Sequence, residues 1–126
     1  MTRFVEMFPP QTAAIMVMRG SRYRLVDSFT CDWELDFTGW VGRMEIRDHR
    51  SEDAQLLADL TPYVHVVPSG TSAVVTVDID ADASELSDVD WSGGVYDIQI
   101  TPTPTDESRT LRVLQGAFHI DPGVTT

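Results

Sequence analysis

Residues 36–48 read DFTGWVGRMEIRD, and two kinds of side chain alternate along most of this stretch. The apolar or small positions are Trp40, Gly42, Met44 and Ile46, and the charged positions are Arg43, Glu45 and Arg47. Successive side chains of a β-strand point to opposite faces of the sheet, so this alternation predicts a half-buried strand over residues 40–47. One face should join a core, and the charged face should meet water or a partner. Thr38–Gly39 predicts a turn before the strand, with positive φ at the glycine.

Similar patterns predict further strands on both sides of this stretch. They cover residues 13–18, 21–26, 63–67, 72–79, 92–100 and 109–121, with a bulge around Gln115–Gly116. Residues 54–61 fit a helical turn or a strand, residues 27–39 fit a loop or a short irregular strand, and residues 81–86 favour the one short helix. The side chains expected in the core are Tyr23, Trp40, Met44, Ile46, Val75, Val77, Ile79, Tyr96, Ile98, Ile100, Leu114 and Phe118.

The spacing of these elements indicates the fold class. Short strands separated by turns every eight to twelve residues are typical of an antiparallel sandwich, and no alternation of strands with helices suggests a parallel sheet. We therefore expect an all-β protein. It would be a single antiparallel, Ig-like β-sandwich of seven or eight strands over residues 13–121, with one short helix near residues 81–88.

The two ends of the chain are expected to lie outside the sandwich. Residues 1–12 predict an extended N-terminal arm rather than a strand, because Pro9 and Pro10 cannot donate ladder hydrogen bonds. The arm is too apolar for a free tail, so we expect it to dock on this subunit or on a neighbour. Its apolar residues are Phe4, Val5, Met7 and Phe8. Residues 122–126 form a C-terminal tail in this interpretation.

The composition narrows the classes of partner. The 126 residues include 20 Asp and Glu against 9 basic residues, all of them Arg, for a net charge of −11. Such a charge repels nucleic-acid phosphates and anionic membranes, so neither is expected as a partner. Cys31 is the single cysteine, which excludes an internal disulfide. Without a recognisable secretion signal or an apolar run of membrane-spanning length, we expect a soluble protein made in a reducing cytoplasm.

No pattern predicts a cofactor, a metal or a reaction. Asp78, Asp80 and Asp82 resemble the start of a calcium loop, but Ala83 and Val89 occupy the positions where an EF-hand needs Gly and Glu. The histidines are His49, His65 and His119; they lack metal-ligand spacing, although the last two could meet across a sheet. The serines lack a nucleophile elbow, and no pair of carboxylates is marked out for acid–base work. A non-enzymatic protein is the expectation.

A family resemblance comes from the order of several short elements. These are residues 19–20, 36–40 (DFTGW), 42–47 (GRMEIR), 56–61 (LLADLT), 75–79, 81–86, 94–98 (GVYDI), 112–116 (RVLQG) and 121–125. Over residues 19–125 this order resembles a β-sandwich family of tailed-phage virion proteins. The family includes the amino-terminal domain of baseplate upper proteins and small tail-fibre-associated minor tail proteins. Phe37 replaces the usual Leu, and Gly42 stands where related sequences often carry a larger residue.

The resemblance implies a structural adaptor with no cofactor. We expect a minor tail protein of the tail tip or baseplate, located in the virion, made in the host bacterial cytoplasm, and present in multiple copies as a homo-oligomer among other virion proteins. The interface residues would be Phe4, Val5, Met7, Phe8, Arg43, Glu45 and Arg47, the last three forming a self-complementary row. Two alternatives stay open: a capsid-surface decoration protein, or a host-wall carbohydrate-binding adhesin that stacks sugars on exposed Trp33, Trp40 or Trp91.

Overall fold

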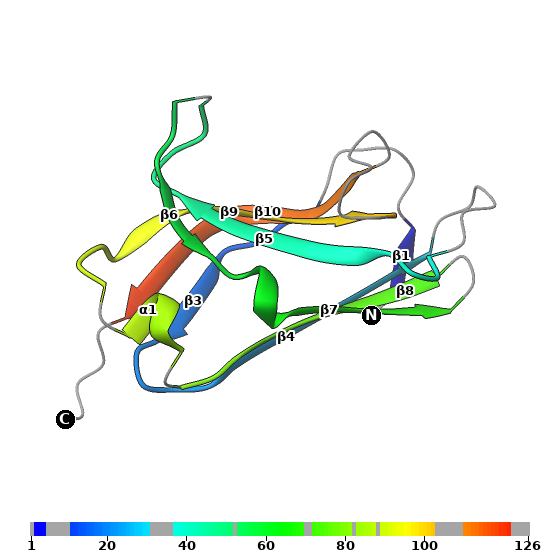
Figure 1. Cartoon of the computed structure of the whole chain (residues 1–126), viewed down its shortest axis with the longest axis horizontal. Coiled ribbons are helices and arrows are strands. Elements are labelled where there is room, and N and C mark those ends of the chain that lie inside the picture. The colour runs from blue at the N-terminus through cyan, green and yellow to red at the C-terminus, as the bar shows by residue number, and fades with distance from the viewer. Residues whose placement is uncertain are drawn as a thin grey trace.

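Two β-sheets pack face to face in the computed structural model of the chain (Figure 1). The structure describes residues 2–4, 11–30, 37–51, 53–69, 72–81, 83–87, 89–102 and 110–121. Sheet A contains, in spatial order, β1 (Thr2–Phe4), β4 (Tyr23–Thr30), β8 (Ser72–Ile79) and β7 (Val64–Ser69). Sheet B contains β2 (Gln11–Thr12), β10 (Leu111–Asp121), β9 (Gly93–Thr101), β5 (Val41–Arg47) and β6 (Leu56–Asp59), and β3 (Ile15–Met18) also pairs with β10. The prediction of an all-β sandwich is confirmed.

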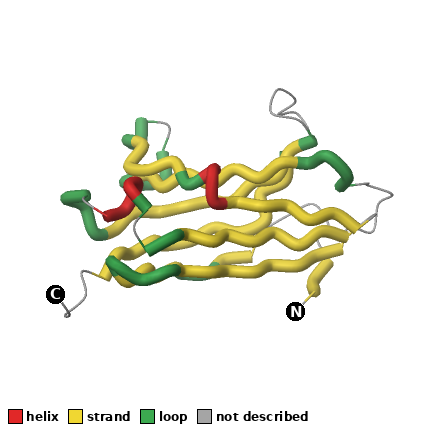
Figure 2. Tube along the Cα trace, turned by 60° about the horizontal axis from the view of Figure 1, so that its bottom comes forward, coloured by secondary structure: helices red, strands yellow, loops and turns green. Residues whose placement is uncertain are grey.

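Helical structure in the described residues is confined to two short turns, which Figure 2 shows in red among the strands. The α-helix α1 (Ser84–Ser87) lies within the region where one short helix was expected. The 3-10 helix η1 (Thr61–Tyr63) follows β6 and carries Pro62 in its first turn. Residues 54–61, for which a strand and a helical turn were both open, therefore contain a strand that leads into η1. No helix among the described residues has the length and apolarity needed to cross a membrane.

The N-terminal segment pairs with both sheets, which differs from the expectation of an arm without strands. β1 runs parallel to β4 in sheet A, while β2 and β3 run parallel to β10 in sheet B. Its backbone thus satisfies ladder hydrogen bonds along one edge of each sheet. The residues between β1 and β2 lie outside the described part of the chain, and with them Val5, Met7 and Phe8.

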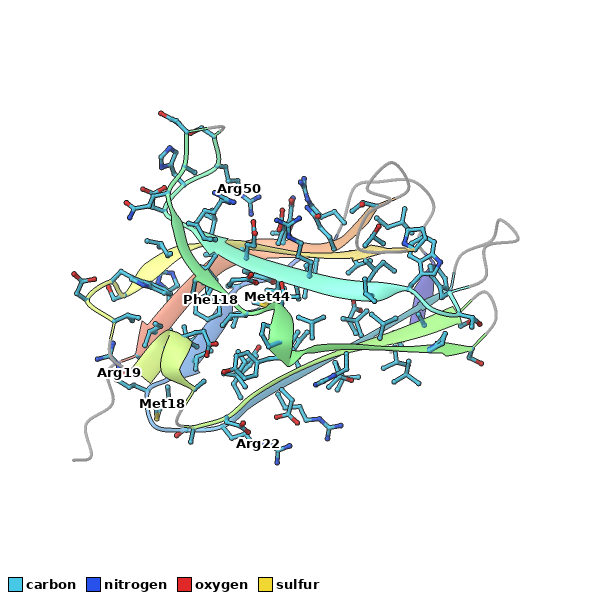
Figure 3. All side chains as sticks on the ribbon, viewed as in Figure 1. Met18, Arg19, Arg22, Met44, Arg50 and Phe118 are labelled. Carbon is cyan, nitrogen blue, oxygen red and sulfur yellow. The ribbon has the colours of Figure 1, made fainter. Side chains whose placement is uncertain are left out.

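The core lies between the two sheets and follows from the alternation of side chains. In β8, for example, buried and half-buried positions alternate over all eight residues. Figure 3 shows Met44 and Phe118 between the sheets, and both side chains are fully buried. Tyr23, expected in the core, is only partly buried at its margin, and the other eleven residues expected there are buried. Each large apolar side chain buried in this way stabilises the fold by about 1.5–3 kcal/mol.

A close backbone crossing fixes the N-terminal segment on sheet B. The Ala13 amide donates to the Gln115 carbonyl at 2.9 Å, and the Tyr96 hydroxyl donates to the Ala13 carbonyl at 2.6 Å. A Cβ atom at Gly116 would stand 2.1 Å from that same carbonyl oxygen. Gly116 therefore serves this crossing, and the irregular pairing of β10 lies earlier, between Arg112 and Leu114, not at the predicted bulge around Gln115–Gly116.

Candidate functional site

The outer face of sheet B gathers charged side chains from three adjacent strands and a loop. On β5 the side chains of Met44 and Ile46 point into the core, so Arg43, Glu45 and Arg47 point outward. The strand register then brings further polar residues beside this row. We call the resulting surface the arginine face, and it consists of Arg43, Glu45, Arg47, Arg50, Asp97, Gln99 and Arg112.

Glu45 is bound from both sides within its own row. Arg43 donates to one carboxylate oxygen at 2.7 Å, and Arg47 donates to the other at 2.9 Å. The Glu45 side chain is only 17% exposed, against 48% for Arg43 and 40% for Arg47. Burial alone would raise the pKa of the Glu45 carboxyl, but the two arginines outweigh it and lower that pKa. The row therefore turns positive charge, rather than alternating charge, toward solvent.

A second group lies one strand away, on β9 and β10. Asp97 forms an ion pair with Arg112, whose Nε lies 3.2 Å away, and accepts a hydrogen bond from Gln99 Nε2 at 3.3 Å. Glu45 and Asp97 are direct cross-strand neighbours, and each has its own arginine partners, two for Glu45 and one, Arg112, for Asp97. Two carboxylates opposite each other in a sheet repel, and the arginine partners offset this repulsion.

The loop after β5 forms a wall beside the face. It rises above sheet B in Figure 1, and Figure 3 shows Arg50 between the loop and the sheet. Arg50 reaches Gln115 on β10 at 3.4 Å, while Arg47 donates to the Ala54 carbonyl at 3.1 Å. The face and the loop enclose an open hollow of about 540 Å³.

The sign of the charge on this face is opposite to that of the rest of the chain. The arginine face holds four Arg, one Glu and one Asp, a net charge of +2. The whole chain has 9 Arg and 20 acidic residues, so the remainder has 5 Arg and 18 acidic residues, a net −13. Asp59 on β6 is the cross-strand neighbour of Glu45 at the rim, and counting it gives +1 and −12. Asp48 and Asp53 of the loop pair with His49 and do not line the hollow, so the side chains that face the hollow are net positive in either count.

The predicted interface residues have different positions in the structure. Arg43, Glu45 and Arg47 come together on the arginine face, as their alternation in the sequence suggests. The backbone of Phe4 lies in β1, but its side chain is outside the described part of the structure, as are Val5, Met7 and Phe8. Four members of the arginine face were not predicted. The strand register places Asp97, Gln99 and Arg112 beside the row, and the loop after β5 places Arg50 there.

The alternatives based on tryptophan and histidine find little support in the described residues. Trp40 is buried and packs edge-on against Phe37, with ring centroids 5.0 Å apart. Trp91 is partly buried against Phe118. Trp33 lies outside the described residues. His65 and His119 lie on β7 and β10, strands of different sheets, so they do not meet across one sheet.

Comparisons with known proteins give one structural similarity. No protein-family model matches the chain, and no curated protein matches it. Among solved structures, it is similar to one described as the N-terminal domain of phage TP901-1 ORF48. The TM-score is 0.49 and the sequence identity 8%, over 96% of this chain and 99% of that one. A TM-score and an identity this low say nothing about function, which is inferred from the chain's own residues.

Proposed function

We propose that the chain is a non-enzymatic structural protein of a tailed-phage virion. It acts as an adaptor, a minor tail protein of the tail tip or baseplate, that joins neighbouring virion proteins through its β-sandwich. The phage assignment rests on the resemblance in element order over residues 19–125. The docking role rests on the structure of the outer face of sheet B.

The arginine face is the observation that carries this role. Arginine is enriched in protein interfaces, where its planar guanidinium group binds carboxylates through paired hydrogen bonds. Here Arg43, Arg47 and Arg112 are already oriented by partners on the same sheet. Side chains ordered before binding lose less conformational entropy when a partner arrives, so the face is preorganised for association.

The N-terminal arm keeps a part in this proposal, in a modified form. β1 and β2 pair with strands of the same subunit, so the backbone of residues 2–4 and 11–12 is engaged within the domain. Contact with a neighbour is therefore assigned to the apolar side chains of the arm, Phe4, Val5, Met7 and Phe8. Their anchoring role stays a prediction.

Locating the protein in purified phage particles tests the proposal. We expect mass spectrometry to detect the chain in intact virions, and antibody labelling under the electron microscope to mark the distal end of the tail. Label over the capsid surface would favour the decoration protein instead. A chain that is made during infection but is absent from particles would contradict a virion role altogether.

A further inference from the structure

The distribution of charge restricts how two copies of this chain can meet, and this inference rests on the proposed assembly role. Two arginine faces placed against each other would bring together two surfaces of net positive charge. Glu45 cannot offset this, because both of its carboxylate oxygens are bound by arginines of its own subunit. A two-fold contact of the face with itself is therefore disfavoured, in contrast to the self-complementary pairing expected from the row alone.

The same chain contains a strongly acidic segment elsewhere. Residues 78–90 carry six carboxylates and no basic residue. Asp80 and Asp90 are exposed, on either side of α1. Three arginines lie at its margin: Arg22 pairs with Asp78 at 2.6 Å, Arg24 is the cross-strand neighbour of Asp78, and Arg19 donates to the Val89 carbonyl. Counting these three arginines, the region still has a net charge of −3, six carboxylates less three guanidinium groups.

The two surfaces lie on different parts of the molecule. The arginine face covers the outer side of sheet B, whereas Figure 1 places α1 at one end of the sandwich. Figure 3 shows the same separation, with Arg50 above sheet B and Arg19 near α1. A contact between these surfaces must join two copies, since one subunit presents them in different directions.

We infer that the arginine face binds the acidic segment 78–90 of a second copy of this chain. The contact is head-to-tail: each subunit offers one basic and one acidic surface to two different neighbours. Contacts of this kind generate a closed ring when the rotation between subunits closes, and an open filament when it does not. Opposite charges steer the approach of the copies and set their orientation, so the association should weaken as salt screens them.

A charge-swap experiment on the full chain tests this contact. The face-reversed variant carries Arg50→Glu and Arg112→Glu, and the segment-reversed variant carries Asp80→Arg and Asp90→Arg. Each variant alone places like charges in the contact, so self-association measured by sedimentation velocity should fall by about tenfold or more. An equal mixture should recover it, because each reversed surface then meets a partner of opposite charge.

Variants with the same change in net charge provide the control. Arg50→Glu should weaken self-association, whereas the double variant Val67→Glu and Ser69→Glu, at exposed positions on the strand β7 of sheet A, should leave it near the wild-type value. Circular dichroism verifies that every variant is folded. If the face-reversed or the segment-reversed variant does not fold, the single substitution Arg50→Glu or Asp90→Arg replaces it. Equal effects of the control double variant and of Arg50→Glu would point to net charge alone and overturn the inference.

Two further results would also overturn it. One is a wild-type protein that stays monomeric up to its solubility limit, and the other is a mixture of reversed variants that fails to recover association. Neither result touches the proposed virion role, which depends on finding the protein in particles. Conversely, a chain that forms charge-dependent assemblies but is absent from particles would contradict the virion role and leave the head-to-tail contact standing.

Discussion

Gly116 lies where the backbone of Ala13 passes over β10, and no side chain fits there. A Cβ at this position would stand 2.1 Å from the Ala13 carbonyl oxygen and 2.8 Å from its carbonyl carbon. These backbone atoms cannot withdraw without disturbing the hydrogen bond from Ala13 to Gln115. We predict that Gly116→Ala lowers the free energy of unfolding by about 1–3 kcal/mol, the usual cost of overpacking, in denaturant titrations.

Gly93→Ala is the matched control for that substitution. A Cβ at Gly93 would come within 3.2 Å of the His119 imidazole, whose side chain is exposed and can rotate away. Its effect on stability should therefore be clearly smaller. Equal losses for the two glycine variants would show that the crossing at Ala13 is not what makes Gly116 necessary.

Tyr96 should make the fold sensitive to alkaline pH. Burial raises the pKa of its hydroxyl, which donates to the Ala13 carbonyl at 2.6 Å. In the unfolded chain the tyrosine loses its proton at about pH 10, while the folded state retains it. The contribution of this group to stability is therefore complete below about pH 10 and is lost as the pH rises above it.

The variant Tyr96→Phe isolates this effect. At neutral pH it should be less stable than the wild type by about 1–2 kcal/mol, because the part-buried Ala13 carbonyl loses its donor. In denaturant titrations repeated up to alkaline pH, its stability should fall less steeply than that of the wild type. Burial also raises the pKa of Tyr23, but this residue is present in both proteins and cancels in the difference. Parallel pH profiles would contradict the assignment to Tyr96.

At the scale of the strands, the alternation of apolar and polar residues predicts a strand correctly where one face of that strand is buried. The range predicted for residues 72–79 coincides with β8, whose side chains alternate throughout. The second half of β4 fell in a stretch for which a loop and a short irregular strand were both open, because residues 27–30 read DSFT and contain turn-forming residues. The structure pairs all four with residues 72–75 of β8. This ladder is a long-range interaction, and long-range pairing overrides local propensity.

The parallel strands and most of the arginine face depend on information that local sequence does not contain. β3 reads as an apolar run, but nothing in that run says that it pairs parallel to β10. Likewise, alternation along β5 marks Arg43 and Arg47, whereas Arg112 joins them only through the register of β9 and β10. The sequence of one strand predicts which of its side chains share a face. The residues beside them on neighbouring strands follow only from the sheet topology.

Contact between β5 and β7 closes the two sheets against each other, and Gly42 permits it. A Cβ at Gly42 would lie 2.3 Å from Cγ1 of Val64. We predict that Gly42→Ala destabilises the protein by about 1–3 kcal/mol, and that adding Val64→Ala recovers part of this loss by making room. A double-mutant cycle in urea measures the coupling. If the two losses simply add, the strands do not meet as the structure has them.

For the molecule as a whole, the charge layout acts on folding and on assembly in opposite directions. The net charge of −11 opposes compaction, because excess carboxylates repel one another in the folded state. The proposed contact between copies instead uses that excess, since it brings the acidic segment 78–90 to the arginine face. The repulsion acts within each subunit, whereas the attraction acts between subunits.

Salt should therefore separate the two effects. At 0.1 M ionic strength charges are screened beyond about 10 Å, which relieves repulsion among distant carboxylates. Exposed ion pairs such as Arg22–Asp78 contribute little to stability, so screening them costs little. We predict that the melting temperature of the dilute monomer rises as sodium chloride is added from low ionic strength, while self-association in concentrated samples declines over the same range. Thermal scans and sedimentation velocity on one salt series measure both.

The thermal scans use dilute samples, because association between copies would itself raise the melting temperature. Added salt would weaken that association and lower the melting temperature, which would mask the relief of repulsion. A melting temperature that falls with salt in the dilute sample would mean that local ion pairs, rather than net repulsion, dominate the electrostatics of the fold.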